Sequence, residues 1–355
     1  MARIRTAVLF GGQSSEHEIS CLSALTVIGA LDPAKYDVKL VGITREGRWL
    51  LADGAGSIRD GSWTASETGA VILPDASQKG LLLAERDGSF RLWPVDLAFP
   101  ILHGRFGEDG TVQGLLELAG IPCVGCGVEA SAVCMDKIFT RRVAAGLGVC
   151  QADYVALEND EIEKDLPAAI RRVEEHLPYP VFVKPSDAGS SRGVSRAASR
   201  EELAGALLLA AREGTRVLAE EEIRGRELEC AVLSFPDGPR ASGVGEVIAA
   251  GGFYSYEAKY SDPSSRTLTD PVLPEGVREE IRASSLEIFQ AVRGKGLARV
   301  DWFLEEKTGR VVFSEINTMP GFTAISMWPM LWKAAGVPLP RQVDLLASCA
   351  LGRDV

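Results

Sequence analysis

Two apolar strands joined by a turn carry charged side chains at alternate positions near the end of the chain. Residues 299–317 read Arg-Val-Asp-Trp-Phe-Leu-Glu-Glu-Lys-Thr-Gly-Arg-Val-Val-Phe-Ser-Glu-Ile-Asn, in which residues 307–310 are typical of a turn. Side chains alternate across a strand, so Arg299 and Asp301 share one face, as do Glu315 and Asn317. An unpaired buried carboxylate is very costly. The pattern therefore predicts a hairpin whose carboxylates meet cations or solvent.

Two interpretations of this hairpin remain open. One is structural, with Arg299 paired to Asp301 or Glu315, or with an exposed sheet face. The other is a hard-cation site, because the oxygens of Asp, Glu and Asn suit Mg²⁺, which also keeps water and phosphate oxygens as ligands. The turn at 318–321 would present backbone N–H groups beside such a metal. The second interpretation indicates phosphoryl chemistry.

A lysine and a small-residue loop provide a candidate phosphate site. The chain has neither a Gly-x-x-x-x-Gly-Lys-Ser/Thr sequence nor the protein-kinase motifs. Instead, Lys184 ends an apolar strand and is followed by a Ser/Gly-rich loop that runs to Gly193. Such a loop lets backbone N–H groups approach phosphate oxygens closely. Most Ser/Gly loops are ordinary turns, so the lysine on the strand is what favours phosphate binding.

Two further segments are compatible with nucleotide binding but also with a plain surface. Lys137 lies in a predicted helical stretch, 128–146, where a solvated lysine is ordinary. Glu220 and the two acids after it end a predicted strand, and adjacent acids are usually exposed. A strand edge at this place could instead offer backbone contacts to an adenine and a carboxylate to a ribose.

The order of the predicted elements indicates an α/β protein with a more antiparallel C-terminal part. A strand at 6–10, a helix through 19–28 and a strand at 38–43 open a layer that we expect to be parallel and to end near residue 124. Later elements are predicted at 181–184 (strand), 200–212 (helix), 217–221 (strand), 275–292 (helix) and 297–317 (hairpin). The polar segment 251–269 has the length of a loop that closes over a ligand.

Charge and cysteine content limit the partners and the compartment. The chain has 355 residues with 38 Lys and Arg against 49 Asp and Glu, and this net charge of −11 argues against a general nucleic-acid or anionic-membrane surface. No apolar run reaches the roughly 18–20 residues that cross a bilayer, and the N-terminal apolar stretch ends in glycines without a cleavage site. Seven scattered cysteines fit reduced thiols better than a metal or redox site at Cys123 and Cys126. We expect a cytoplasmic protein.

Seven motifs in one order resemble the D-alanine–D-alanine ligases, a family of the ATP-grasp superfamily. They span most of the chain, at residues 11–20, 102–110, 135–137, 183–193, 256–260, 299–301 and 315–323. The resemblance implies three domains: an N-terminal α/β substrate-binding domain (1–125), a central ATP-grasp subdomain (126–220), and a C-terminal subdomain (221–355) with the metal site and a mobile loop. The last two would clasp ATP between antiparallel sheets.

The same resemblance implies the cofactors and their contacts. ATP and two Mg²⁺ or Mn²⁺ ions are expected, with Glu315 bridging the metals beside Asp301 and Asn317. The expected nucleotide contacts lie in three places, on the phosphates, the adenine and the ribose: Lys137, Lys184, Ser191, Glu220, Glu221, Ile223, Glu227 and Lys259.

The implied reaction joins two D-alanine molecules through a D-alanyl phosphate, for peptidoglycan precursor synthesis, in a homodimeric enzyme. Glu16 is expected to hold the first ammonium, with Ser190 and Tyr260 linking Glu16 to the mobile loop. Arg299 and the Gly321 N–H would stabilise the oxyanion, and Ser326 would receive the second carboxylate. Lys259 would reach the transferred phosphate. His103 has two open roles, orienting the first substrate or packing.

Several alternatives stay open at this point. D-serine stays open as the second substrate, because it differs from D-alanine by only one hydroxyl. D-lactate is disfavoured because the loop at 256–260 keeps Lys259 and Tyr260. A nucleotide-binding regulatory protein without catalysis is disfavoured, because it would have no need for Arg299 beside two metals. Another carboxylate-activating ATP-grasp enzyme is disfavoured by the motifs around Glu16 and His103. Arg192 and Ser255 depart from the residues common in the family.

Overall fold

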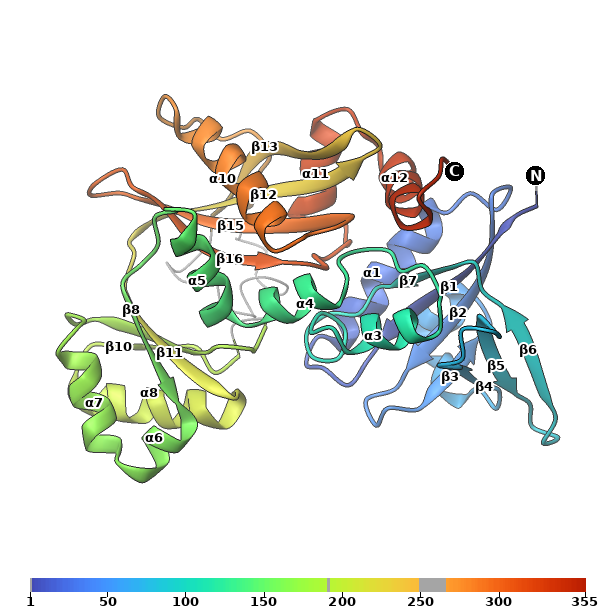
Figure 1. Ribbon diagram of the computed structural model, residues 1–355, viewed down its shortest axis with the longest axis horizontal. Coiled ribbons are helices and arrows are strands. Elements are labelled where there is room, and N and C mark those ends of the chain that lie inside the picture. Colours follow the sequence, from blue (N-terminus) through green and yellow to red (C-terminus); the bar gives the residue numbers. More distant parts are fainter. Residues whose placement is uncertain (1, 190–191, 249–265) are drawn as a thin grey trace.

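The computed structural model describes residues 2–189, 192–248 and 266–355, which form three sheets in consecutive parts of the chain (Figure 1). The first sheet has seven strands in the order β6-β5-β4-β3-β2-β1-β7. Its elements are β1 (Ile4–Gly11), α1 (His17–Ala30), β2 (Tyr36–Ile43), β3 (Trp49–Ala52), α2 (Ala55–Asp60), η1 (Ser62–Ala65), β4 (Gly69–Ile72), β5 (Gly80–Ala84), β6 (Phe90–Pro94), β7 (Leu97–Pro100) and α3 (Thr111–Leu118).

Only part of this first sheet has the parallel arrangement predicted from the alternation of strands and helices. β1 pairs in parallel with β2 and with β7, whereas β3, β4, β5 and β6 are added antiparallel. The connections 44–48, 73–79 and 85–89 are too short for the crossover that parallel strands need. The parallel centre is the part that directs the loops after β1 and β7 toward the rest of the molecule.

The second sheet is small and entirely antiparallel. Its order is β10-β9-β11-β8, and helices α6, α7 and α8 lie with it in the lower left lobe of Figure 1. Buried apolar residues of α7 and α8 pack against this sheet. The elements are β8 (Tyr154–Glu158), α6 (Asn159–Lys164), α7 (Leu166–Glu174), β9 (Val181–Pro185), β10 (Ser195–Ala197), α8 (Arg200–Glu213) and β11 (Arg216–Glu221).

The third sheet is also antiparallel, in the order β14-β13-β12-β15-β16. It contains the predicted hairpin as β15 and β16, and α10 packs on it. The elements are β12 (Gly225–Phe235), β13 (Gly238–Ile248), β14 (Arg266–Leu268), α10 (Val277–Ala291), β15 (Leu297–Glu305), β16 (Val311–Asn317), α11 (Met327–Ala334) and α12 (Leu339–Leu351).

The predicted single helix over 128–146 is wrong, because the structure has two helices there, α4 (Val128–Met135) and α5 (Lys137–Gly146). Asp136 separates them in an extended conformation and caps α5 by accepting hydrogen bonds from the N–H groups of Ile138 (2.8 Å) and Phe139 (3.3 Å). Asp is a strong N-cap residue. The break makes Lys137 the first residue of α5 instead of a residue inside a longer helix.

The C-terminal end of the chain packs back on the first sheet. One apolar cluster combines Val8 and Phe10 of β1 with Leu346 of α12. The Tyr36 hydroxyl donates to Asp344 at 2.9 Å, and Lys35 forms an ion pair with the same carboxylate at 2.7 Å. Figure 1 shows α12 beside α1 and β7, far from the lobe of the second sheet. This packing brings the segment after β16 against the first part of the chain.

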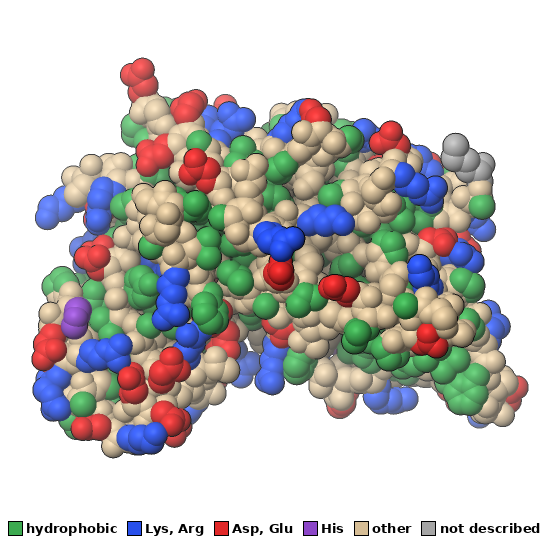
Figure 2. Space-filling view, viewed as in Figure 1, with side chains coloured by type: hydrophobic (Ala, Val, Ile, Leu, Met, Phe, Trp, Pro, Cys, Tyr) green, Lys and Arg blue, Asp and Glu red, His purple; other side chains and the backbone are tan. Residues whose placement is uncertain are grey.

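The molecular surface mixes charges of both signs. Figure 2 shows basic and acidic side chains interspersed over the lobe of the second sheet and over the rest of this face. Within the described parts of the chain, no helix combines the length and the apolar character needed to span a bilayer.

The Asp136 cap can be tested against a matched cap elsewhere. We expect Asp136→Ala to lower the free energy of unfolding by about 1–2 kcal/mol, because two N–H groups lose their acceptor. Asp165→Ala removes the comparable cap of α7, where the carboxylate accepts from Ala168. The loss at Asp136 should be the larger one, since Arg216 also forms an ion pair with it. Scanning calorimetry measures both, and an unchanged melting temperature for Asp136→Ala would contradict the assignment.

Candidate active site

The face of the β15–β16 hairpin collects four polar side chains. Asp301 lies opposite Glu315 and Arg299 lies opposite Asn317 in the strand register. Directly opposite residues of antiparallel strands project to the same side, so all four share one face. A bulge follows at once, because Trp302 pairs with Phe313 and Ser314 is left over. The hairpin thus keeps its charged groups together on one side of the sheet.

Arg299 is bound by two carboxylates on this face. Its guanidinium donates to Asp301 through Nε (2.7 Å) and a terminal nitrogen (2.6 Å), and it lies 3.3 Å from Glu229 of β12. Burial alone would lower the pKa of Arg299, but the charges of Asp301 and Glu229 outweigh it and raise this pKa well above its usual value. Of the pairings expected from the sequence, the structure therefore contains the one with Asp301. Arg299 stays a fixed positive charge.

Glu315 is paired with a cation from a different part of the chain. Lys137, at the start of α5, lies 3.1 Å from a Glu315 carboxylate oxygen and donates to the carbonyl oxygen of Ala188 at 2.9 Å. The side chain is mostly buried, with 12% of it exposed, so the surface-lysine interpretation is wrong. Lys137 thus joins α5, the loop after β9 and the hairpin at one point.

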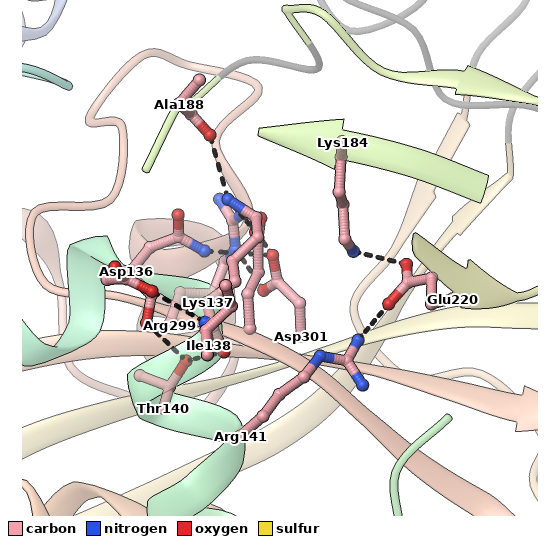
Figure 3. A network of polar contacts seen from close by, with 12 residues as sticks. Asp136, Lys137, Ile138, Thr140, Arg141, Lys184, Ala188, Glu220, Arg299 and Asp301 are labelled. Carbon is pink, nitrogen blue, oxygen red and sulfur yellow. Dashed lines mark hydrogen bonds and ion pairs between the residues drawn. The ribbon is translucent and has the colours of Figure 1, made fainter. Parts of the chain in front are cut away.

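Lys184 and Arg141 hold Glu220 between them (Figure 3). The Lys184 ammonium lies 2.5 Å from one carboxylate oxygen, and the Arg141 guanidinium binds the other. Burial lowers the pKa of Lys184, whereas the two cations overcome burial and lower that of Glu220. Glu220 is thus a buried anion rather than part of an exposed acidic run. Removing one partner of such a pair costs about 3–5 kcal/mol.

Glu16 approaches the site from the first sheet, directly before α1. One of its carboxylate oxygens lies so close to the backbone that a Cβ at either Gly104 or Gly189 would come within 2.8 Å of it. A side chain at either position would displace the Glu16 carboxylate, and at Gly104 the backbone φ of +70° also favours glycine. Gly189 belongs to the Ser/Gly loop after β9, so Glu16 lies between the first and the second parts of the molecule.

The turn after β16 forms the remaining wall. The hydroxyl of Ser326 accepts a hydrogen bond from the Thr323 N–H at 3.0 Å and lies 2.8 Å from the Thr323 hydroxyl. A Cβ at Gly321 would come within 2.8 Å of that Ser326 hydroxyl. The Gly321 backbone and the Ser326 side chain are therefore neighbours, as their expected roles require.

One cavity of about 660 Å³ unites these groups. Every sequence-predicted site residue within the described parts of the chain lines it, namely Glu16, His103, Lys137, Lys184, Glu220, Glu221, Ile223, Glu227, Arg299, Asp301, Glu315, Asn317, Gly321 and Ser326. The other four candidates lie outside the described residues, namely Ser190, Ser191, Lys259 and Tyr260. Most of the predicted 251–269 loop lies outside them as well.

Two residues that raised questions in the sequence have clear positions. His103 is buried, and both of its ring nitrogens bond to the protein, at 2.9 Å from the Met319 carbonyl oxygen and 3.0 Å from the Ser23 hydroxyl. This geometry favours the packing role. Arg192 forms an ion pair with Glu213 of α8 at 2.6 Å, and its side chain is exposed.

The polar residues of the cavity wall that the sequence analysis did not predict include Arg141, Glu229 and Glu108. Arg141 follows Lys137 by four residues on one helix, a spacing that places both on one helix face. Glu229 follows Glu227 by two residues on β12, so alternation assigns both to one sheet face. These two signals were readable in the sequence, whereas Glu108 offered none beyond its motif.

The donor set on the hairpin suits a hard divalent cation. Asp301, Glu315 and Asn317 supply only oxygen ligands, and the Asn317 amide already donates to Asp301 at 3.1 Å. Among the described residues, no group of three or more His, Cys, Asp or Glu side chains is placed to hold a metal. The hairpin set offers two carboxylates and one amide. The residues present therefore fit a magnesium-type ion that takes further ligands from phosphate and water.

Comparison with protein families accounts for this arrangement. Residues 5–126 match the model of the D-ala D-ala ligase N-terminus, and residues 143–348 match that of the D-ala D-ala ligase C-terminus. The D-alanine–D-alanine ligase of Acetivibrio thermocellus is 46% identical over 362 residues, which cover 98% of this chain and 96% of the relative. The chain belongs to the D-alanine–D-alanine ligase family. This is an ATP-dependent carbon–nitrogen ligase family of the ATP-grasp type.

Other members of the family agree in sequence and structure. The D-alanine–D-alanine ligase of Caldicellulosiruptor bescii is 44% identical, with 100% of this chain and 97% of the relative covered. The solved VanG D-Ala:D-Ser ligase from Enterococcus faecalis superposes with a TM-score of 0.88 at 36% identity, covering 98% of this chain and 100% of that one. The solved D-alanine–D-alanine ligase from Coxiella burnetii superposes with a TM-score of 0.85 at 35% identity, covering 99% of this chain and 95% of that one. The predicted α/β fold of the ATP-grasp type is confirmed, and the structure builds it from three sheets.

The pKa of Glu108, in the cavity wall, lies far from its ordinary value. Its two oxygens accept hydrogen bonds from the N–H groups of Gly104 (2.7 Å) and Met319 (3.0 Å). Removal from water and the nearby charge of Glu16 outweigh these bonds and raise the pKa of Glu108 to about 8. The folded state thus binds this proton more tightly than the unfolded chain does.

This shift predicts how stability depends on pH. Because the folded-state pKa is raised, the contribution of Glu108 to stability is fully present below its ordinary value and is lost as pH rises toward about 8. We expect the melting temperature of Glu108→Gln, relative to the parent protein, to be higher at pH 8.5 than at pH 5.5. Glu117→Gln, at an exposed position of α3, is the control. An equal difference at both pH values for Glu108→Gln would show that Glu108 titrates normally.

Proposed function

We propose that this protein ligates two D-alanine molecules to D-alanyl-D-alanine, with conversion of ATP to ADP and phosphate, for peptidoglycan precursor synthesis. The observation that carries the proposal is the single cavity in which Lys137 and Lys184, the hairpin carboxylates and Glu16 meet. The near-complete coverage of relatives named D-alanine–D-alanine ligase supports the same reaction.

ATP would lie between the second and third sheets. Its phosphates would meet Lys137 and Lys184, whose carboxylate partners now neutralise them. The adenine would lie beside Glu220 and the backbone of Glu221 and Ile223, where β11 ends. Glu227 on β12 lies in the same cavity and would bind the ribose hydroxyls. Ser191 and Lys259 complete the proposed contacts.

Two magnesium or manganese ions would be held by Asp301, Glu315 and Asn317. Bound there, such ions would neutralise charge on the phosphate oxygens during transfer. The chain itself contributes Lys137, which already contacts Glu315, and Arg299, which contacts Asp301. Binding of ATP and metal would therefore exchange existing ion pairs for new ones instead of introducing uncompensated charges into the cavity.

In the first step, an oxygen of the D-alanine carboxylate attacks the γ-phosphorus of ATP, the bond to the β-phosphate oxygen breaks, and ADP leaves. The chain's task here is positioning and charge stabilisation. The Glu16 carboxylate would bind the substrate ammonium and so hold its carboxylate toward the phosphates. Ser190 and Tyr260 would tie Glu16 to the 251–269 segment, which would keep water from the acyl phosphate.

In the second step, the amine of the other D-alanine attacks the acyl carbon, loses a proton, and expels phosphate. The developing oxyanion would be stabilised by the Arg299 guanidinium and the Gly321 N–H. A single oxyanion donor in a dry site is worth roughly 3–4 kcal/mol. Ser326, whose hydroxyl lies against Gly321, would receive the carboxylate of the attacking substrate.

A second candidate function is a ligase that joins D-alanine to D-serine. The observation in its favour is the close structural match, at a TM-score of 0.88, to the VanG D-Ala:D-Ser ligase. The relatives with 44–46% identity carry the D-alanine–D-alanine name, which favours D-alanine as second substrate. The homodimer and the cytoplasmic location stay predictions.

Product analysis tests the proposal directly. Purified protein is incubated with ATP, Mg²⁺ and D-alanine, with or without D-serine, while ADP release is followed and products are identified by mass. We expect one D-alanyl-D-alanine per ADP, and D-alanyl-D-alanine as the main product when both amino acids are present at equal concentration. Predominant D-alanyl-D-serine would support the second candidate, and ATP binding without ADP release would support a non-catalytic nucleotide-binding protein.

A pair of hairpin variants makes the product assay specific to the cavity. Glu315→Gln should keep the fold and reduce turnover by at least ~10²-fold, because a charged oxygen ligand is lost where phosphoryl charge develops. Glu305→Gln is its matched control, since Glu305 ends β15 and pairs with Arg310 outside the cavity. Parental turnover in Glu315→Gln would refute the proposed metal contacts.

A further inference from the structure

The turn that carries Gly321 is held from the first part of the chain by hydrogen bonds to its backbone. Ser23 of α1 accepts the N–H of Phe322 at 3.1 Å, and its hydroxyl lies 3.0 Å from His103 Nε2. His103 Nδ1 lies 2.9 Å from the carbonyl oxygen of Met319. Ser23, His103, Met319 and Phe322 are all buried, so these bonds do not compete with water.

The partners assign the proton positions along this chain of bonds. The Met319 carbonyl can only accept, so His103 Nδ1 carries a hydrogen, and in a neutral imidazole Nε2 is then the acceptor. The Ser23 hydroxyl therefore donates to His103 while its oxygen accepts from Phe322. This needs a neutral imidazole, in agreement with the lowering of the His103 pKa by burial. Each of these hydrogen bonds then joins one donor to one acceptor.

Glu108 adds a further bond to the same turn. One of its oxygens accepts the Met319 N–H at 3.0 Å while the other accepts the Gly104 N–H at 2.7 Å. Met319 is thus bound at both its N–H and its carbonyl, and Phe322 at its N–H. These residues flank Pro320 and Gly321, which themselves have little freedom to relax once both neighbours are fixed.

We propose that Ser23, acting through His103 and Phe322, is a positioning residue that sets the direction of the Gly321 N–H. The inference rests on the proposed function, in which that N–H stabilises the oxyanion. On this proposal, Ser23 of α1 contributes to the second chemical step. Glu16, directly before the same helix, would bind the first substrate.

The two chemical steps make the proposal testable. Phosphoryl transfer to the D-alanine carboxylate creates no tetrahedral carbon, so it does not need the Gly321 N–H. Attack of the amine does need it. If the turn loses the Ser23 hydrogen bonds, the acyl phosphate still forms but reacts more slowly with the amine. Water then hydrolyses part of the acyl phosphate to D-alanine and phosphate. ADP is then released without dipeptide.

The experiment measures ADP and dipeptide in the same reaction for Ser23→Ala. We expect dipeptide formation to fall ~10- to 100-fold, as for a small misplacement of a reacting group. ADP formed per dipeptide should rise clearly above one, with the KM for ATP unchanged. This ratio does not depend on the fraction of folded protein, so it separates positioning from lost stability.

Two further variants complete the design. Ser131→Ala removes a buried hydroxyl of α4 that has no hydrogen-bond partner among the residues that the structure describes, and it should keep the parental ratio and rate. Ser23→Cys fills the same space with a weaker donor and acceptor, and it should lie between the parent protein and Ser23→Ala. If Ser23→Ala does not fold, the ADP-to-dipeptide ratio of Ser23→Cys tests the proposal in its place.

The outcomes separate this inference from the proposed function. A parent protein that forms no dipeptide refutes the proposed function and, with it, this inference. A parent that forms one dipeptide per ADP, with Ser23→Ala slower or unchanged but still at one ADP per dipeptide, refutes only the positioning role. Loss of coupling in Ser131→Ala as well would also refute it, because the effect would then not be specific to the turn.

Discussion

Mutual neutralisation of buried charges governs how this cavity is built. Asp301, Glu315 and Glu220 each meet a cation, from Arg299, Lys137 and Lys184 respectively. An isolated charge in such a place would be very unfavourable, and pairing removes most of that penalty. One of these pairs joins separate parts of the molecule, because Lys137 at the start of α5 pairs with Glu315 of the hairpin and also donates to the Ala188 carbonyl in the loop after β9. The Lys184–Glu220 pair lies within the second sheet and the Arg299–Asp301 pair lies within β15. The contacts of Lys137 and Arg141 on α5 therefore connect the second and third sheets at the site.

This arrangement explains how one cavity can accept a highly charged ligand. Triphosphate and divalent ions bring opposite charges in nearly matched amounts, so lysines can turn to phosphate as carboxylates turn to metal. Arg299 differs, because its two carboxylate partners keep it charged and in place. The backbone turn at 319–322 is equally fixed, by bonds from α1 and from the loop after β7. The groups proposed to meet the reacting carbon are thus fixed by contacts within the protein, while the groups proposed to meet the nucleotide would exchange one partner for another.

The sequence predicted those parts of the site that depend on local periodicity. Strand alternation placed Arg299 with Asp301 and Glu315 with Asn317, and the register confirms that they share a face. Recognition of motifs then identified many of the described polar residues that line the cavity, although not Arg141 or Glu229. The break at Asp136 was not predicted, because apolar periodicity continues across it and only the side-chain cap reveals it. The Ser23 contact joins residues almost 300 positions apart, and no local pattern encodes such a contact.

The most direct test of the charge-exchange account is the location of metal in the loaded protein. Crystals grown with Mn²⁺ and a non-hydrolysable ATP analogue would be measured for anomalous scattering. The account predicts manganese peaks within coordination distance of Asp301, Glu315 and Asn317, with Lys137 moved from Glu315 to phosphate. An occupied nucleotide site with no manganese at these side chains, and with the Lys137–Glu315 pair unchanged, would contradict it.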